Sequence, residues 1–129
     1  MKKELIICIV VISLVVIGNI VTQNYTKKCV ENMEQQLEQF KEVVLQKEKN
    51  KEEIKEKIEM VKTKWDDMQE KLAFYIEHDE LEKVEAEIAL MEGQSESELY
   101  DEICPELEKC IFILEHIEDK TALNVKNIF

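Results

Sequence analysis

The sequence predicts an all-α protein in which an N-terminal transmembrane helix continues into an antiparallel bundle of about four helices. Three observations lead to this fold class: an uncharged apolar run near the N-terminus, apolar residues spaced alternately three and four apart, and only two Gly and one Pro among 129 residues. A sheet protein would need more turn residues. We expect residues 1–26 to form a cytoplasmic stub and transmembrane anchor, and residues 27–129 to form an acidic helical bundle.

The predicted anchor lies in the run from Leu5 to Thr26, which contains no charged residue. Ile, Val and Leu dominate residues 5–21, a length near the lower end of the roughly 17–25 residues that cross a bilayer. Lysine pairs flank the run on both sides: Lys2, Lys3, Lys27 and Lys28. Tyr25 is expected at the far interface of the membrane. The sequence therefore predicts that residues 5–26 contact the lipid bilayer.

A cleaved signal peptide is the main alternative, with Val16-Ile17-Gly18 as the cleavage site. Ile20 and Val21 continue the apolar run past that site, which favours an uncleaved anchor. Because both flanks carry two lysines, only the N-terminal amine favours a cytoplasmic N-terminus. We expect a single-pass protein of the cell membrane whose C-terminal domain is extracytoplasmic.

Apolar residues at alternating spacings of three and four predict the helices of the bundle. The first stripe continues from the anchor, and Asn50 interrupts the charged stretch that follows it. A second stripe ends at Tyr75, Gly93 is a candidate C-cap for the third helix, and Ser95 with Glu98 resembles a capping box that would start the fourth. The four stripes are Val30, Met33, Leu37, Phe40 and Val44; Ile54, Ile58, Val61, Trp65, Met68, Leu72 and Tyr75; Leu81, Val84, Ile88 and Met91; and Leu99, Ile103, Leu107, Cys110, Leu114 and Ile117.

The segment around His78 has a structural and a chemical interpretation. In the structural one, His78 ends a helix, Asp79 caps the next, Glu82 completes a capping box and Leu81 opens the new stripe. In the chemical one, His78 binds a divalent metal or transfers protons, and a metal site would require His116 and a nearby glutamate to meet it in space. The structural interpretation accounts for more of the residues.

Composition argues against several classes of function. A formal net charge of −12 disfavours nucleic-acid binding, and the absence of Arg removes the bidentate donor that grips phosphate. The four cysteines form no C-x-x-C pair, and Cys104 and Cys110 lie too far apart on one helix for a disulfide, although a bridge involving Cys29 stays open. No phosphate loop, zincin motif or nucleophile–base pattern is present, so we expect a noncatalytic protein without a cofactor.

The stretch "WDDMQEKLAFYIEHDELEKVEAEIAL" and the final "NIF" resemble a family of small proteins from spore-forming Gram-positive bacteria, domain of unknown function 4363. The matching residues are Trp65, His78, Asp79, Glu80, Leu81, Asn127, Ile128 and Phe129, while Val125 stands where the family has Leu. The resemblance covers nearly the whole chain and implies a small anchored helical protein. It also implies a membrane partner, a multi-spanning protein of the YetF type.

Two functions follow as expectations. The first is an interaction or accessory subunit for a membrane or envelope protein, and the alternative is an extracytoplasmic sensor that binds a ligand in response to metal or pH. The tail gives a further expectation, because a charged chain that ends on Ile128 and Phe129 would gain roughly 1.5–3 kcal/mol for each buried side chain. We expect the tail to dock beside the Trp65 stripe, with capture by a partner as the rival.

Overall fold

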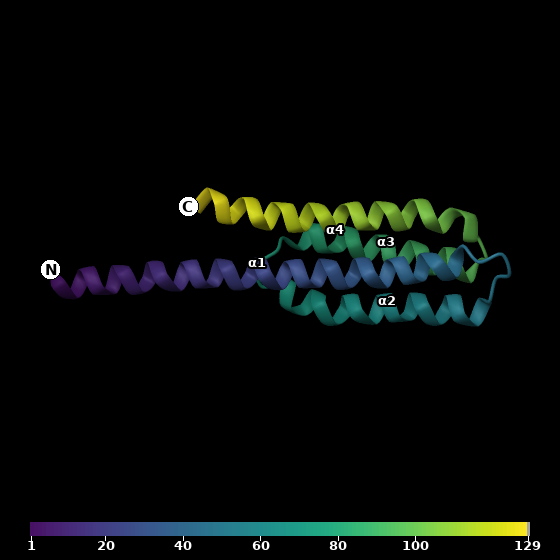
Figure 1. Cartoon of the computed structure of the whole chain (residues 1–129), viewed down its shortest axis with the longest axis horizontal. Coiled ribbons are helices and arrows are strands. Elements are labelled where there is room, and N and C mark those ends of the chain that lie inside the picture. The colour runs from purple at the N-terminus through teal and green to yellow at the C-terminus, as the bar shows by residue number, and fades with distance from the viewer. Residues whose placement is uncertain (129) are drawn as a thin grey trace.

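The computed structural model describes the backbone of residues 1–128 and the side chains of residues 1–122, and it contains four helices in that range (Figure 1). The helices are α1 (Lys2–Val44), α2 (Lys51–Leu72), α3 (His78–Glu96) and α4 (Tyr100–Ile128). They run alternately up and down, joined by short connections. The predicted all-α fold with an N-terminal apolar helix is confirmed.

Each helix packs against two neighbours, so that α1 contacts α2 and α4, and α3 contacts the same two helices. Ion pairs join adjacent helices at the surface: Lys41 Nζ lies 2.6 Å from Glu108 Oε1, and Lys62 Nζ lies 3.2 Å from Glu92 Oε2. The predicted stripes supply the core, since every stripe residue from Val30 to Ile117 is buried except Tyr75 and Leu99. No helix can bury such a stripe alone, so the four helices pack together and bury their apolar stripes against one another.

Helix α1 is unbroken from the apolar run into the bundle. Its first half projects beyond α2 and α3, and the C-terminal end of α4 reaches past them in the same direction, while the second half of α1 contributes the core residues from Cys29 to Val44 (Figure 1). The projecting part has a mean hydropathy of 2.9 over its most apolar window, and none of that window is buried. By length and composition, α1 is therefore a candidate membrane span.

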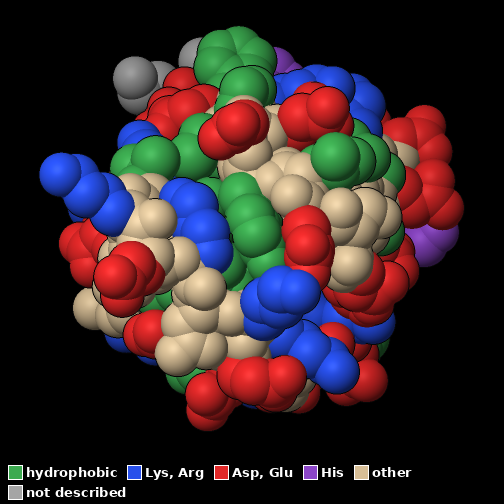
Figure 2. Space-filling view, turned by 90° about the vertical axis from the view of Figure 1, so that its right-hand side faces the viewer, with side chains coloured by type: hydrophobic (Ala, Val, Ile, Leu, Met, Phe, Trp, Pro, Cys, Tyr) green, Lys and Arg blue, Asp and Glu red, His purple; other side chains and the backbone are tan. Residues whose placement is uncertain are grey.

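The end of the bundle away from the apolar run carries the α1–α2 and α3–α4 connections (Figure 1). Asn50 is the N-cap of α2, with its side-chain oxygen accepting a hydrogen bond from the Glu53 amide at 3.2 Å. Seen end-on, this distal end is covered largely by Asp, Glu and Lys side chains with apolar ones between them (Figure 2). The charged turn predicted around Asn50 thus lies at the distal end and begins α2 with a side-chain cap.

The predicted boundary between the second and third helices is wrong in detail. Helix α2 ends at Leu72, so Tyr75 lies in the connection instead of on the helical stripe. Helix α3 begins at His78 with Glu77 as its N-cap residue, and no side chain caps it. Asp79 is consequently in the first turn, where a carboxylate interacts favourably with the helix dipole, and it is not the N-cap.

The predicted end of the third helix is also wrong. Gly93 lies inside α3, which continues to Glu96, and Ser95 belongs to the same helix instead of capping the next. The left-handed residue that terminates α3 is Glu98, with φ 59°. The Leu99 amide donates to the Gln94 carbonyl at 2.8 Å and the Glu98 amide to the Ser95 carbonyl at 3.2 Å, which is a Schellman motif. Helix α4 therefore starts at Tyr100, and Leu99 is exposed.

Candidate functional site

The end of the bundle nearest the apolar run, here called the junction, is held by a polar contact between α1 and the α2–α3 connection. The Tyr75 hydroxyl donates to Thr26 Oγ1 at 2.7 Å, and its oxygen also lies 3.2 Å from the Thr22 carbonyl oxygen. Thr26 Oγ1 also donates to the Thr22 carbonyl, at 2.8 Å. Thr26 is buried, whereas Tyr75 is 38% exposed. The contact therefore fastens the connection to the last turn of the apolar run.

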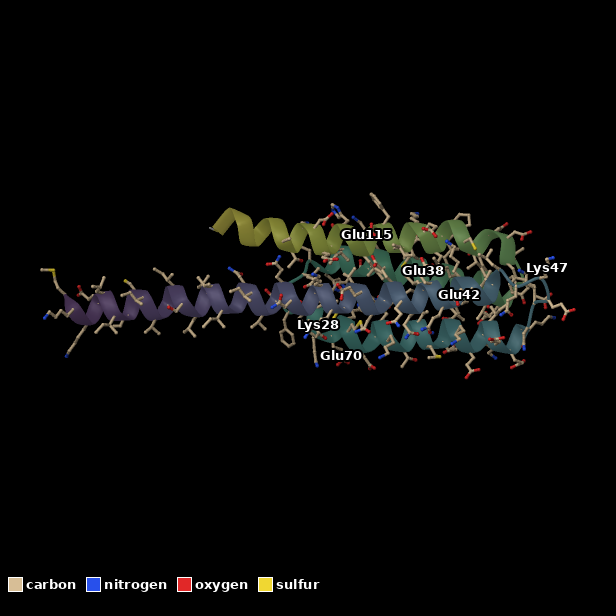
Figure 3. All side chains as sticks on the ribbon, in the orientation of Figure 1. Lys28, Glu38, Glu42, Lys47, Glu70 and Glu115 are labelled. Atoms are coloured by element: carbon tan, nitrogen blue, oxygen red, sulfur yellow. The ribbon has the colours of Figure 1, made fainter. Side chains whose placement is uncertain are left out.

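A thiol and a lysine complete the junction. The Cys29 side chain is buried, and burial raises the pKa of its thiol above the usual value. The Lys71 ammonium lies 5.9 Å from the centre of the Tyr25 ring, within the range of a cation–π contact. Figure 3 shows Lys28 on α1 and Glu70 on α2 at this end of the bundle, and Lys47 at the opposite end. Charged side chains thus surround the base of the projecting helix.

A small cavity of about 80 Å³ opens beside Tyr75, between the α2–α3 connection and α4. Glu80 lines it and is 8% exposed. Lys120 Nζ lies 3.8 Å from Glu80 Oε1 and 3.4 Å from Glu77 Oε2, so one lysine serves two carboxylates. Glu80 Oε2 has no hydrogen-bond partner among the described residues. A volume of this size accommodates a few waters, the simplest donors for that oxygen.

A second polar site lies between α3 and α4. Glu87 is 7% exposed, and its Oε1 lies 2.9 Å from Lys109 Nζ. The neighbouring Glu87 carboxyl raises the pKa of the Glu106 carboxyl, and burial adds to the effect. The second carboxylate oxygens of Glu87 and Glu106 are both buried without a partner among the described residues. Two facing carboxyl groups of this kind share a proton more readily than isolated ones.

Acidic side chains also meet between α1 and α4. Burial raises the pKa of Glu34, and the neighbouring Glu115 raises it further. Burial likewise raises the pKa of Glu118, although Lys27 opposes the shift. Figure 3 shows Glu115 on α4, and Glu38 on α1 somewhat closer to the distal end. The bundle thus brings like charges together along the α1–α4 seam.

Trp65, which the sequence marks as a candidate, is a core residue. It is 1% exposed, and its Nε1 has no hydrogen-bond partner among the described residues. It lies seven residues before the end of α2, about 10 Å along the helix from the junction. Trp65 therefore packs the bundle and does not share a site with His78.

The three candidates around the α2–α3 connection separate in space. His78 is exposed, and its Nε2 lies 2.9 Å from Glu82 Oε1, one turn further along α3. Asp79 is exposed, whereas Glu80 is buried beside Lys120. The prediction for the tail concerns side chains of Asn127, Ile128 and Phe129 that lie outside the described residues.

The metal hypothesis gains no support from the part of the chain that the structure describes. Within it, no three His, Cys, Asp or Glu side chains are placed to hold a metal ion. His116 is exposed on α4. All four cysteines are free, so the bridge left open for Cys29 is not formed.

Sequence reasoning missed the residues that make the junction and the carboxyl pair. Thr26 and Tyr75 are 49 positions apart, and no local pattern joins them. Glu87 could have been noticed, because it lies three residues after Val84 and four before Met91 and so flanks the apolar stripe of α3. Its partner Glu106 has the same signal, because it lies three residues after Ile103 and four before Cys110 on the stripe of α4.

Taken together, the fold defines a class of protein: an acidic up-and-down four-helix bundle built on one long helix whose apolar first half extends past the ends of α2 and α3. A family model described as domain of unknown function (DUF4363) matches residues 20–128, and the chain belongs to this family. No curated protein and no solved structure matches the chain. The family membership confirms the resemblance seen in the sequence.

Proposed function

We propose that the protein is a noncatalytic, membrane-anchored helical bundle that acts as an interaction or accessory subunit for another membrane or envelope protein. The observation that carries the proposal is the continuity of α1, whose exposed apolar half leads without a break into the core of the bundle. A rigid helix of this kind holds the bundle at a set distance from the bilayer.

The exposure of the apolar half supports an anchoring role. Apart from Val16, the Ile, Leu and Val side chains from Leu5 to Val21 are about half exposed or more, and an apolar surface of this extent is not stable in water. Lipid tails would cover it, with the flanking lysines at the two interfaces. The proposed orientation leaves the N-terminus in the cytoplasm and the bundle outside.

The chemistry of the polar sites supports a role without catalysis. The Tyr75 hydroxyl is engaged by Thr26 and Thr22. Burial raises the pKa of the Cys29 and Cys110 thiols, that of Cys110 to about 12, and a protonated thiol is a poor nucleophile. The junction cavity of about 80 Å³ is far smaller than the roughly 300–1,000 Å³ of ligand pockets.

Site-specific crosslinking in native membranes tests the proposal. A photoactivatable side chain would replace Met60, Leu90 or Phe112, which are exposed apolar residues on three different helices, and Lys55 would serve as a charged control. An accessory subunit predicts a discrete adduct with one membrane or envelope protein from at least one apolar position and none from Lys55. A protein of the YetF type is one candidate. Absence of any adduct from the three positions would contradict the proposal.

A second function, a pH-responsive domain, is favoured by the Glu87–Glu106 pair. Protonation of Glu106, whose pKa the neighbouring Glu87 raises, would couple the packing of α3 against α4 to pH. Crosslinking repeated at mildly acidic and neutral pH separates the two candidates, because only a sensor predicts that the yield of adduct changes and that Glu106→Gln abolishes the change.

A further inference from the structure

The junction exposes an aromatic side chain that the packing of the bundle does not use. Phe74 lies in the α2–α3 connection and is 89% exposed. Its neighbours on either side are tied down: Tyr75 bonds to Thr26 and Thr22, and the Ala73 amide donates to Gln69. Phe74 is therefore exposed on a turn whose flanking residues are held in place by hydrogen bonds.

The hydrogen bonds of Tyr75 place this turn relative to the apolar run. Thr22 immediately follows Val21, the last residue of the most apolar segment, and Thr26 lies one helical turn further. Because α1 is continuous here, the turn stands at the level where the candidate span ends. Any bilayer that covers residues 5–21 would bring its headgroups to the level of Phe74.

The charged groups near the turn fit the same environment. Lys71 lies in the last turn of α2 and contacts the Tyr25 ring, and Lys27 and Lys28 lie on α1 just beyond Thr26. Aromatic rings with nearby lysines are typical of the membrane–water interface, where the ring is buried among acyl chains and the ammonium reaches the phosphates. Two aromatic side chains, Tyr25 and Phe74, thus occur with three lysines at this end of the bundle, where Glu70 and Glu77 also lie.

We infer that the α2–α3 turn is a second membrane contact, in which Phe74 inserts into the interfacial region of the bilayer that α1 crosses. The inference rests on the anchoring role proposed above. The turn and α1 then hold the bundle at two points, so that it stands on the membrane at a fixed rotation about α1. One face of the bundle is thereby presented consistently to a partner in the same membrane.

Phe112 provides a matched control. It is 69% exposed, and it lies on α4 between Glu108, which pairs with Lys41, and Glu115, which lies near Glu34. Glu34 and Lys41 are eight and fifteen residues beyond Thr26, so Phe112 stands about 12–22 Å further from the span. A bilayer that reaches Phe74 does not reach Phe112.

Fluorescence quenching by brominated lipids tests the inference on the full-length protein. Phe74→Trp and Phe112→Trp would each be made in a Trp65→Phe background and reconstituted into vesicles whose acyl chains carry bromine close to the glycerol. We expect the emission at position 74 to fall about twofold and shift to shorter wavelength, because an indole at the interface meets the bromines. Emission at position 112 should not change. Equal emission with and without bromine at position 74 would overturn the inference.

Flotation of the vesicles distinguishes a missing contact at position 74 from a missing membrane anchor. Protein that floats with the vesicles but shows no quenching at position 74 retains its anchor and lacks the second contact. Protein that does not float contradicts both. A blue shift at position 74 that depends on protein concentration and not on bromine would assign Phe74 to self-association, which also overturns the inference.

A second readout keeps Trp65 in case the background substitution weakens folding. A fluorophore would be attached to Phe74→Cys or Phe112→Cys after Cys8 and Cys104 are replaced by Ala, since Cys29 and Cys110 are buried. Nitroxide-labelled lipid should quench the first and spare the second. Equal quenching of the two would contradict the proposed contact.

Discussion

The Tyr75 hydroxyl lies 2.7 Å from Thr26 Oγ1 and joins the end of the apolar run to a turn 49 residues later in the chain. Thr26 is buried, and burial raises the pKa of the Tyr75 phenol, which further favours the protonated form that donates this hydrogen bond. The junction is the place where the candidate anchor and the bundle become one rigid unit.

Removing this hydrogen bond should weaken the bundle modestly. We expect Tyr75→Phe and Thr26→Val to cost about 1 kcal/mol each in the free energy of unfolding, the usual value for one hydrogen bond. The double variant should cost less than the two single losses together, because both remove the same contact. Chemical denaturation of the detergent-solubilised protein measures all three. Strictly additive losses would mean that the two hydroxyls do not interact.

Trp65 should be the most sensitive of the candidate residues. Trp65→Ala leaves a large cavity among buried side chains and should cost roughly 3–5 kcal/mol. Trp65→Phe should cost clearly less, because Nε1 has no partner among the described residues and no hydrogen bond is lost. Thermal unfolding followed by circular dichroism would compare the two. A Phe variant as unstable as the Ala variant would point to a polar role for the indole.

His78 should matter little for stability. Its side chain is 73% exposed, and its pair with Glu82 is a surface contact within one helix. We expect His78→Ala to change the free energy of unfolding by no more than about 0.5 kcal/mol. A loss of crosslinks to a partner with unchanged melting would instead identify His78 as part of a binding surface.

Mild acidification should stabilise the bundle. The pKa values of Glu34, Glu106 and Glu118 are raised above the ordinary 4.5 in the folded state, so the folded protein binds more protons than the unfolded chain. This stabilisation is greatest when the pH is near or below the pKa of the carboxyl groups in the unfolded chain. It is lost as the pH rises through their raised pKa values in the folded protein. We expect the melting temperature to rise as pH falls from about 7 to about 5.

One substitution tests how much of the stabilisation at mildly acidic pH comes from the Glu87–Glu106 pair. Glu106 faces Glu87 on α3 and Lys109 on its own helix, and Gln imitates its protonated form. Glu106→Gln should raise the melting temperature at neutral pH and flatten the pH dependence, whereas Glu102→Gln, at an exposed position of α4, should do neither. If the melting temperature of Glu106→Gln depended on pH as that of the wild type does, protonation of this carboxyl pair would not contribute to the effect.

The sequence predicts the bundle well because helical spacing translates directly into burial. Apolar residues three and four apart must share one face, and the stripes from Ile54 to Leu72 and from Ile103 to Ile117 are indeed buried. The apolar half of α1 is equally easy to recognise, because its hydropathy and length alone mark it as a candidate membrane span.

Helix boundaries and the polar contacts are less predictable, for physical reasons. Gly93 is the obvious C-cap by residue type, yet Glu98 adopts the left-handed conformation and its carboxylate forms an ion pair with Lys51. His78 starts a helix without a side-chain cap, so rules based on caps misplace that boundary. The Thr26–Tyr75 contact depends on how the α2–α3 connection is placed against α1, which local sequence patterns do not encode.

Protease added to intact protoplasts, followed by mass spectrometry of the fragment left in the membrane, tests the central claim most directly. An anchored bundle on the outside predicts digestion of residues beyond the junction, with a retained fragment that begins at Met1 and ends near Lys27 or Lys28. A bundle that resists digestion until the cells are lysed would contradict the proposed orientation. A mature protein that begins at Asn19 would contradict the anchor itself.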